Sequence, residues 1–262
     1  MTGTPKISLR GVTKSFGNEH VLTGVDLDVA NGESVVLVGP SACGKTLLFK
    51  CILGLIPPDS GSIKIDGQET VGLPPADREE LLRRTGMLFQ QSALFDSLTV
   101  WENVAFRLMQ NRGRNGAMSR RDAKQVAIQK LADVGMDAEV ANLLPADLSG
   151  GMQKRVGFAR AIAGDPEIIF LDEPTAGLDP IMTNIINELI LDGVHRLGAT
   201  VLSITSNMDG ARKIADRIAM LHGGKIIWTG PADEVEETGN PYVDQFIHSR
   251  AEGPIETIMT PA

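Results

Sequence analysis

Gly39-Pro-Ser-Ala-Cys-Gly-Lys-Thr46 is the stretch of sequence that decides the fold. It matches the pattern G-x-x-x-x-G-K-[ST], in which backbone N–H groups of a glycine-rich loop surround phosphate groups at a helix N-terminus. The apolar run before it, residues 34–38, predicts a buried strand, and residues 47–53 predict the first turns of a helix. Because strand, loop and helix are the context that this pattern requires, we expect a phosphate-binding loop here.

The composition bears on partners and on cellular location. The chain has 262 residues, of which 42% are hydrophobic, so one large domain can bury a full core. A net charge of −8 and a pI near 5.1 argue against nucleic acid as the principal partner, because phosphate affinity is built from clustered Lys and Arg. No apolar run approaches the ~20 residues that span a bilayer, and residues 1–10 lack the apolar segment of a signal peptide. We therefore expect a soluble, cytosolic protein.

The two cysteines, Cys43 and Cys51, both lie in or near the glycine-rich loop. A buried thiol is the favoured interpretation of each, and a structural disulfide is not expected in the cytosol. The less favoured alternative is a redox role for Cys43, whose pKa the helix N-terminus could lower.

Alternating apolar residues predict two N-terminal strands, residues 7–12 and 21–29, separated by the turn-like Ser15-Phe-Gly-Asn18. Phe16 in this turn is either a core side chain or a ring presented to an adenine base, and the residue pattern alone favours the core. A short strand at residues 62–67, closed by an Asp-Gly turn, completes a small antiparallel sheet.

A helix is expected after this sheet, with Asp77 as its N-cap, Leu81 and Leu82 facing inward and Gly86 as its stop. A strand at residues 87–89 then leads to Gln90. From about residue 92 to residue 157 helical spacing replaces strands, which predicts an inserted helical lobe.

Ser119 is the expected N-cap of a helix in this lobe, and Gly135 its terminator. The basic residues of the lobe are interpreted as a solvated face rather than a binding patch. They occupy positions 112, 114, 120, 121 and 124.

The second half of the chain alternates strands with helices. The expected elements are a buried strand at 166–171, a helix from Asp179-Pro180 to Gly198, a strand at 200–204, a hairpin of 217–222 and 225–229 joined by Gly223-Gly224, and short helices near 233–237 and 241–249. Alternating strands and helices around a phosphate-binding loop imply a three-layer α/β core of the P-loop NTPase class.

Four side chains are expected to carry the chemistry. Lys45 should reach the β- and γ-phosphates of a nucleotide, and the Thr46 hydroxyl should ligate Mg²⁺. Leu171-Asp-Glu-Pro174 delivers two adjacent carboxylates at the C-terminal end of a buried strand, where α/β sheets bind their ligands. Asp172 fits a second-shell ligand of Mg²⁺. Glu173 points the other way, toward the γ-phosphate, where it can orient and deprotonate water.

A further motif makes the pattern specific. Leu148-Ser-Gly-Gly-Met152 is a glycine pair at a helix start, a weak signal by itself. Together with the loop and the Asp-Glu pair it resembles ATP-binding-cassette (ABC) ATPases, and the resemblance covers nearly the whole chain. The resemblance implies that Ser149, Gly150 and Gly151 form the signature loop, which contacts the γ-phosphate held by the opposite subunit. It also implies ATP and Mg²⁺ as ligands and a head-to-tail homodimer with two composite sites.

The resemblance assigns roles to further positions. Phe16 looks like the aromatic residue that stacks on adenine, which reverses the preference for a core position. Gln90 resembles the Q-loop glutamine, which contacts Mg²⁺ or the attacking water, and Asp179 looks like the D-loop aspartate. Ala42 stands where the family more often has glycine. The nucleotide-binding loop comprises Gly39, Pro40, Ser41, Ala42, Cys43, Gly44, Lys45, Thr46 and Leu47.

One position departs from the family pattern. After the strand 200–204 the family usually has Ser-His-Asp, whose histidine contacts the γ-phosphate, whereas this chain reads Thr205-Ser206-Asn207. The four histidines are His20, His195, His222 and His248, all elsewhere in the sequence. Ser206 is too short to replace an imidazole, so we expect secure ATP binding with slow hydrolysis, or even a nucleotide-gated assembly module with little turnover.

The segments 87–95 and 98–104 resemble the ATPase of lipid transporters that work with mce-domain proteins, the maintenance-of-lipid-asymmetry type. Membership implies two membrane-spanning permease subunits, an mce-domain partner, a phospholipid or other hydrophobic cargo, and a STAS-domain regulatory subunit as a further candidate. It also implies a position on the cytoplasmic face of the inner membrane. An importer of polar solutes remains an alternative, because it shares every ATP motif.

The expected domain is residues 1–246, with the helical lobe 92–157 inserted. Residues 247–262 form a tail that either docks on a neighbouring subunit, as the resemblance implies, or is disordered.

Overall fold

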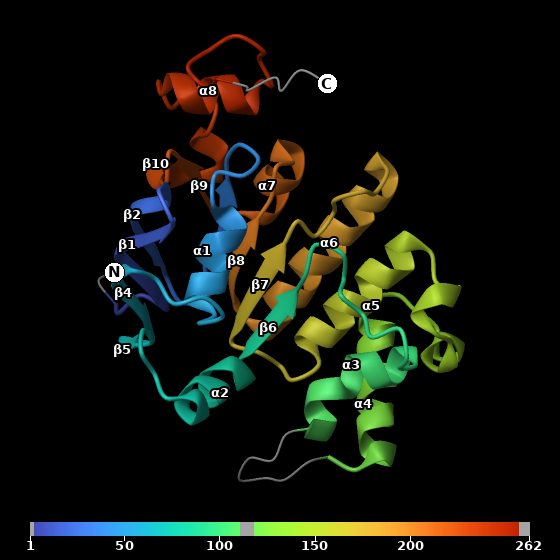
Figure 1. The fold of residues 1–262 in the computed structure, drawn as a ribbon. Helices are drawn as coiled ribbons and strands as arrows, with labels where there is room; N and C mark the ends of the chain where they lie inside the picture. The colour runs from blue at the N-terminus through green and yellow to red at the C-terminus, as the bar shows by residue number, and fades with distance from the viewer. Residues whose placement is uncertain (1–2, 111–117, 257–262) are drawn as a thin grey trace. The chain divides into compact units, whose positions relative to one another are not determined.

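A computed structural model describes residues 3–110 and 118–256, which pack as two compact units. The first, which we call the loop unit, comprises residues 3–30, 34–71 and 204–256. The second, the helical unit, comprises residues 31–33, 72–110 and 118–203 (Figure 1).

A four-stranded antiparallel sheet forms one part of the loop unit (Figure 1). Its order is β2-β1-β4-β5. The strands are β1 Ile7–Phe16, β2 Glu19–Val29, β4 Ser60–Ile65 and β5 Gln68–Glu69. The alternating residues Ile7, Leu9 and Ile63 are fully buried, which fixes the face that the sheet turns to the core. The small antiparallel sheet expected from the sequence is therefore confirmed.

The rest of the loop unit surrounds the strand that precedes the glycine-rich loop. This strand, β3, pairs in parallel with β9, which pairs antiparallel with β10. The elements are β3 Ser34–Val38, α1 Lys45–Ile52, α7 Met208–Ile214, β9 Arg217–His222, β10 Lys225–Pro231, η3 Ala232–Glu234 and α8 Pro241–Ile247. All five residues of β3 are buried, so the strand holds the loop in a rigid core.

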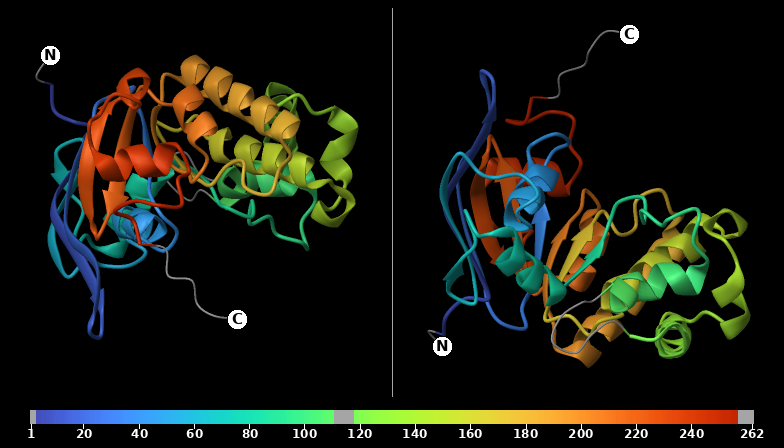
Figure 2. Two further views of the ribbon diagram at one scale, coloured as in Figure 1. Left: turned by 90° about the horizontal axis from the view of Figure 1, so that it is seen from above. Right: turned by 60° about the horizontal axis from the view of Figure 1, so that its bottom comes forward.

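The helical unit contains strands in the order β8-β7-β6 together with five α-helices. The strands are β6 Thr85–Leu88, β7 Ile168–Asp172 and β8 Thr200–Ile204, of which all but the last residue of β8 belong to this unit. The helices are α2 Pro75–Arg83, α3 Val100–Gln110, α4 Arg120–Asp133, α5 Gly150–Ile162 and α6 Pro180–Leu197, with short 3-10 turns η1 Ala138–Asn142 and η2 Pro145–Asp147. Helices α5 and α6 lie side by side (Figure 2). Phe158 of α5 packs on Gly193 of α6. The expected run of helices before the Asp-Glu strand is present.

Several expected helix ends are confirmed. Ser119 caps α4 by accepting a hydrogen bond from the Asp122 N–H, and Asp179 caps α6. Gly198 ends α6 with φ 61°, and Gly223-Gly224 joins β9 to β10. These positions follow the side-chain and backbone preferences that the sequence displays directly.

The first two strands are longer than expected. β1 continues to Phe16 and β2 begins at Glu19, so that only Gly17 and Asn18 form the turn. The register of β1 shifts between Leu9 and Val12, around Gly11 with φ 57°. The register shifts again between Val12 and Thr13 and between Lys14 and Ser15, so the alternation is lost over the last four residues of the strand, which the pattern missed.

The helix α2 differs from expectation at both ends. Pro74 stands at its N-cap, so Asp77 lies inside the first turn, and Leu81 and Leu82 are only half-buried. Gly86 does not stop this helix, because it lies in β6. A Cβ at Gly86 would lie 2.2 Å from the Ala161 carbonyl oxygen, so close packing against α5 explains the glycine.

Two elements of the structure were not predicted from the sequence. The helix α7 was not expected, and β5 adds a two-residue strand to the small sheet. Positions 112, 114 and 257–262 lie outside the described residues. Within the described part of the chain, none of the helices has the length and apolar character needed to cross a membrane.

Candidate functional site

The glycine-rich loop leaves β3 at a position that only glycine can occupy. Gly39 has φ 148°, and a Cβ there would lie 2.2 Å from the Leu221 carbonyl oxygen of β9. Gly44, with φ 103°, packs against Leu22 of β2, and a Cβ there would lie 3.0 Å from that side chain. Both framing glycines are therefore required by backbone conformation and by close approach.

Ala42 is the strained residue of the loop. Its φ of 60° lies in the left-handed region, where an L-residue with a Cβ is disfavoured by roughly 1 kcal/mol or more. The family's frequent glycine at this place has no such cost. The loop therefore holds Ala42 in its functional shape against a local preference.

Lys45 is folded back into the loop. Its Nζ donates to the carbonyl oxygens of Gly39 at 2.7 Å and Pro40 at 2.9 Å, and the residue is 8% exposed. The helix α1 that starts here has no side-chain cap and no acidic residue in its first turn. Its first N–H groups and the ammonium together suit an anion, because both carry positive charge at the same helix end. Thr46 lies exposed in this first turn.

The Cys51 thiol is buried and the Cys43 thiol is half-buried, and neither is activated. Burial raises the pKa of Cys43, although Lys45 acts in the opposite direction, and burial raises the pKa of Cys51 to about 11. The alternative of a lowered Cys43 pKa is therefore wrong, because desolvation outweighs the positive charge nearby. Neither thiol has the character of a redox centre.

Phe16 ends β1 with 53% of its surface exposed. The Lys14 Nζ lies 5.7 Å from the centroid of its ring. The core position favoured by the residue pattern is therefore wrong, and the ring is open for stacking on a planar group.

Ser206 and Asn207 are exposed between β8 and α7. The Asn207 side chain accepts a hydrogen bond from the Gly210 N–H at 2.9 Å and caps α7. A groove of about 530 Å³ is lined by Pro40 of the loop, by Ser206 and Asn207, and by C-terminal residues that include Gln245 and Phe246. The loop unit thus brings Ser206 beside the glycine-rich loop.

The helical unit holds the carboxylate pair. The strand β7 is buried throughout and ends at Asp172, which is 6% exposed. Glu173 follows with φ 46°, a left-handed conformation, and is half-buried. The strand therefore delivers two neighbouring carboxylates, one buried and one half-buried.

Gln90 is exposed, two residues beyond the end of β6. Its backbone carbonyl accepts a hydrogen bond from the Nζ of Lys154, which also donates to the Glu173 carbonyl at 3.2 Å. Burial lowers the pKa of Lys154, while Asp172 and Glu173 act to raise it. No role for Lys154 was predicted from the sequence, because both of its acceptors are backbone atoms distant in the chain.

The signature residues begin α5. Ser149 is the N-cap, and its Oγ accepts a hydrogen bond from the Met152 N–H at 3.3 Å. Ser149 and Gly150 are exposed, whereas Gly151 is buried and a Cβ there would lie 2.5 Å from Met182 Cε. Asp179 caps α6 by accepting from the N–H groups of Ile181 and Met182. The exposed start of α5 is a surface that can meet a second molecule.

The residues expected to hold Mg²⁺ are Thr46 in the loop unit and Gln90 and Asp172 in the helical unit. Hydroxyl, amide and carboxylate oxygens are the ligands that this hard cation prefers. Among residues 3–110 and 118–256, no three His, Cys, Asp or Glu side chains gather into a metal-binding cluster. Each of these donor types suits a cation that keeps waters and substrate phosphates among its ligands.

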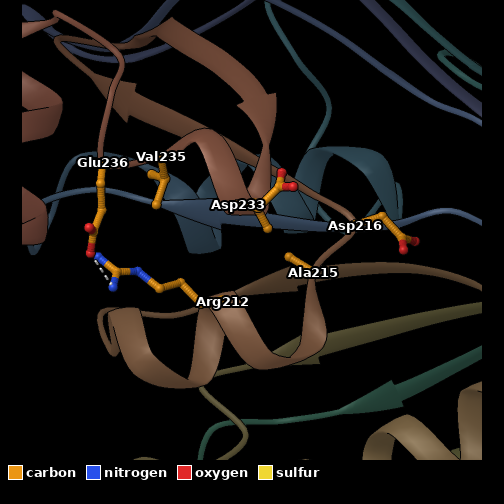
Figure 3. Close-up of a pocket in the computed structure, with 7 residues that line it drawn as sticks. Arg212, Ala215, Asp216, Asp233, Val235 and Glu236 are labelled. Atoms are coloured by element: carbon orange, nitrogen blue, oxygen red, sulfur yellow. Dashed lines mark ion pairs between the residues drawn. The ribbon is translucent and has the colours of Figure 1, made fainter.

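A second pocket, of about 490 Å³, lies between α7 and the segment around η3 (Figure 3). Arg212 and Glu236 face each other across it in an ion pair of 2.7 Å, and Asp216 accepts a hydrogen bond from the Ser34 N–H. Because these charged groups are engaged in holding the fold, the pocket has a structural explanation.

The chain is similar to known proteins along most of its length. The family profile described as "ABC transporter" matches residues 22–176. The chain is 40% identical over 265 residues to the protein TRIGALACTOSYLDIACYLGLYCEROL 3, chloroplastic, of Arabidopsis thaliana, covering 95% of this chain and 75% of the relative. It is 37% identical over 249 residues to the probable ribonucleotide transport ATP-binding protein mkl of Mycobacterium leprae, covering 95% and 70%.

A solved structure is similar as well. It is the dimeric, post-hydrolysis state of the ATP-binding cassette MJ0796 bound to ADP and Pi, with a TM-score of 0.78 and 33% identity. The match covers 86% of this chain and 98% of that chain. The α/β fold of the P-loop NTPases is thereby confirmed. The chain belongs to the ABC transporter family, as an ATPase that binds ATP with Mg²⁺ and drives a transporter.

Proposed function

We propose that this chain is the motor subunit of a membrane lipid transporter, in which ATP closes two copies head to tail and hydrolysis reopens them. The observation that carries the ATP site is the loop of residues 39–46, in which Lys45 Nζ rests on two loop carbonyls. An incoming phosphate attracts this ammonium more strongly than neutral carbonyls do, so Lys45 turns to the β- and γ-phosphates. Phe16 stacks on the adenine, and the remaining loop residues surround the phosphates through their N–H groups.

Glu173 acts as the general base of hydrolysis. Its carboxylate accepts a proton from the attacking water while the water oxygen bonds to the γ-phosphorus and the bond to the β–γ bridging oxygen breaks. ADP and phosphate leave. Thr46, Asp172 and Gln90 would hold Mg²⁺, which offsets the charge of the phosphates.

The signature residues act on the neighbouring copy. Ser149 and Gly150 are exposed at the N-terminus of α5, where N–H groups and the helix dipole attract anions. In a head-to-tail dimer they contact the γ-phosphate held by the partner copy, and Asp179 lies at the same interface. ATP favours the closed dimer because it contacts both copies only there.

Hydrolysis is expected to be slow because Ser206 replaces the usual histidine. Loss of one preorganised donor costs roughly 10²–10³ in rate. Ser206→His in the assembled complex should raise the steady-state ATPase rate, with the KM for ATP little changed. An unchanged ATPase rate in Ser206→His would contradict this explanation of slow hydrolysis. If single-turnover hydrolysis is also negligible in the unmodified complex, the alternative of a nucleotide-gated assembly module is favoured.

The lipid cargo is supported by the Arabidopsis relative, whose name contains a glycolipid, and by the resemblance of residues 87–95 to mce-associated ATPases. Two permease subunits, an mce-domain protein and a STAS-domain subunit are the proposed partners, at the cytoplasmic face of the inner membrane. The Mycobacterium leprae relative, named for ribonucleotide transport, supports the alternative of a polar cargo.

Co-purification separates these cargo classes. The tagged chain, purified with its partners in mild detergent, should bring down an mce-domain protein and bound phospholipid, detectable by mass spectrometry. A soluble solute-binding protein in their place would refute the lipid proposal.

A truncated chain tests the proposed domain of residues 1–246 with its inserted lobe 92–157. The chain lacking residues 247–262, purified in the same way, should still fold and bind ATP.

A further inference from the structure

Lys154 is a buried cation that the hydrolysis scheme above leaves without a role. It lies in α5, five residues beyond the N-cap Ser149, and only 5% of its surface is exposed. A buried ammonium loses its hydration, so its position must be stabilised by specific acceptors.

Its acceptors belong to the two segments that carry the proposed chemistry. The Nζ donates to the carbonyl oxygen of Gln90, which follows β6, and to that of Glu173, which follows β7, at 3.2 Å. One ammonium therefore joins the Q-loop, the loop of the general base and the signature helix within the helical unit. Asp172 and Glu173 also attract it through their charges.

The Glu173 backbone needs such support. Its φ of 46° is left-handed, a conformation that a residue with a Cβ adopts only when its surroundings hold it. Its carbonyl also accepts a hydrogen bond from the Ala176 N–H at 3.2 Å. Fixing this carbonyl fixes the orientation of the peptide plane, and with it the direction in which the Glu173 side chain leaves the backbone.

We propose that Lys154 is a positioning residue for ATP hydrolysis. It holds the backbones of Gln90 and Glu173 in fixed positions relative to the signature helix α5. The proposal rests on the general-base role of Glu173. Through this link, displacement of α5 on dimer closure moves the backbone of the base and of the Q-loop together.

The neighbouring Arg155 offers a matched control. It is also a cation of α5 that donates to a backbone carbonyl, that of Gly135 at 3.1 Å, but it contacts neither Gln90 nor Glu173 in the hydrogen bonds of the described chain. Lys154→Met and Arg155→Met each remove one cation and keep an unbranched side chain. Lys154→Met removes the donor to the carbonyls of Gln90 and Glu173, whereas Arg155→Met removes the donor to the carbonyl of Gly135.

The experiment compares the two variants in the full chain, assembled with its co-purifying permease subunits. For Lys154→Met we expect kcat to fall at least tenfold, with the KM for ATP within twofold, and hydrogen exchange of the Ala176 amide to accelerate at least tenfold. Arg155→Met should leave kcat, the KM for ATP and the Ala176 exchange rate within twofold of the values of the unmodified chain. If Lys154→Met does not fold, Lys154→Gln keeps hydrogen-bond donors without the charge and should give an intermediate kcat with the same KM.

Two results would overturn the positioning role. The first is that Lys154→Met shows the same kcat and the same Ala176 amide exchange rate as Arg155→Met. The second is that Lys154→Met loses kcat and ATP affinity together and has a lowered Tm. Glu173→Gln, measured alongside, separates the two proposals. If it retains turnover, the general-base assignment fails. If it abolishes turnover while Lys154→Met has no effect, only the positioning role fails.

Discussion

Ala42 is the residue whose backbone conformation most clearly opposes its side chain within the phosphate-binding loop. Replacing it by glycine should relieve the left-handed strain and stabilise the fold by about 0.5–1 kcal/mol. Thermal unfolding should show a Tm about 2 °C higher. The control is Ala76→Gly in the exposed part of α2, where glycine is disfavoured and should lower Tm. If Ala42→Gly also lowers Tm, the loop does not hold this conformation in solution.

The thiols give a second prediction at this scale, with a defined pH dependence. A raised pKa means that the neutral thiol persists to higher pH, so at pH 8 only about a thousandth of Cys51, with a pKa of about 11, is thiolate. Alkylation of Cys51 by iodoacetamide should be slow in the native protein and should accelerate sharply only above pH 10. The same chain in guanidinium chloride should react as free cysteine does. Rapid native alkylation of Cys51 at pH 8 would contradict the burial.

Residue identity alone predicted part of the site. The loop residues and the Asp-Glu pair were predictable because the chemistry requires those residue types at fixed spacing. Phe16 was misjudged from its pattern because an aromatic residue at a strand end can be core or surface, and only packing decides. Lys154 was missed because a lysine in a helix resembles a solvated charge unless its acceptors are known.

At the scale of elements, the contact between β6 and α5 is set by Gly86. A Cβ at this position would lie 2.2 Å from the backbone oxygen of Ala161, which cannot rotate away. Gly86→Ala should therefore destabilise the fold by about 3 kcal/mol, through forced separation of strand and helix. Gly164→Ala is the control, because a Cβ there meets no atom within 4 Å. Urea unfolding should show a lower midpoint for the first variant alone, and equal midpoints would refute this explanation of the glycine.

The same contact shows why element ends were harder to predict than elements. Gly86 looks like a helix stop in the sequence, because glycine serves both as terminator and as a place of close approach. The register shifts after Val12 hid the last four residues of β1 in a similar way. Caps such as Ser119 and Asp179 were predictable because their side chains bond to backbone N–H groups two or three residues away.

At the scale of the whole molecule, the residues of the proposed site are divided between two compact units, and the signature residues are proposed to act on another copy. The loop unit holds Lys45 and the helical unit holds Glu173, while Ser149 lies exposed at the start of α5. The sequence predicted the family and the fold because its motifs span nearly the whole chain. The slow turnover expected from Ser206 stays a prediction, which the ATPase rate of Ser206→His tests.

Subunit complementation tests the central claim, that each ATP site is completed by a second copy. Lys45→Ala and Ser149→Arg should each abolish ATPase activity as homodimers, by loss of the loop lysine and of the signature contact. When the two variants are mixed in equal amounts and assembled, half of the dimers are mixed. Each mixed dimer joins one intact loop with one intact signature, so the mixture should recover about a quarter of the unmodified rate. A mixture as inactive as its parents, with mixed dimers demonstrated by differential tags, would contradict the composite site.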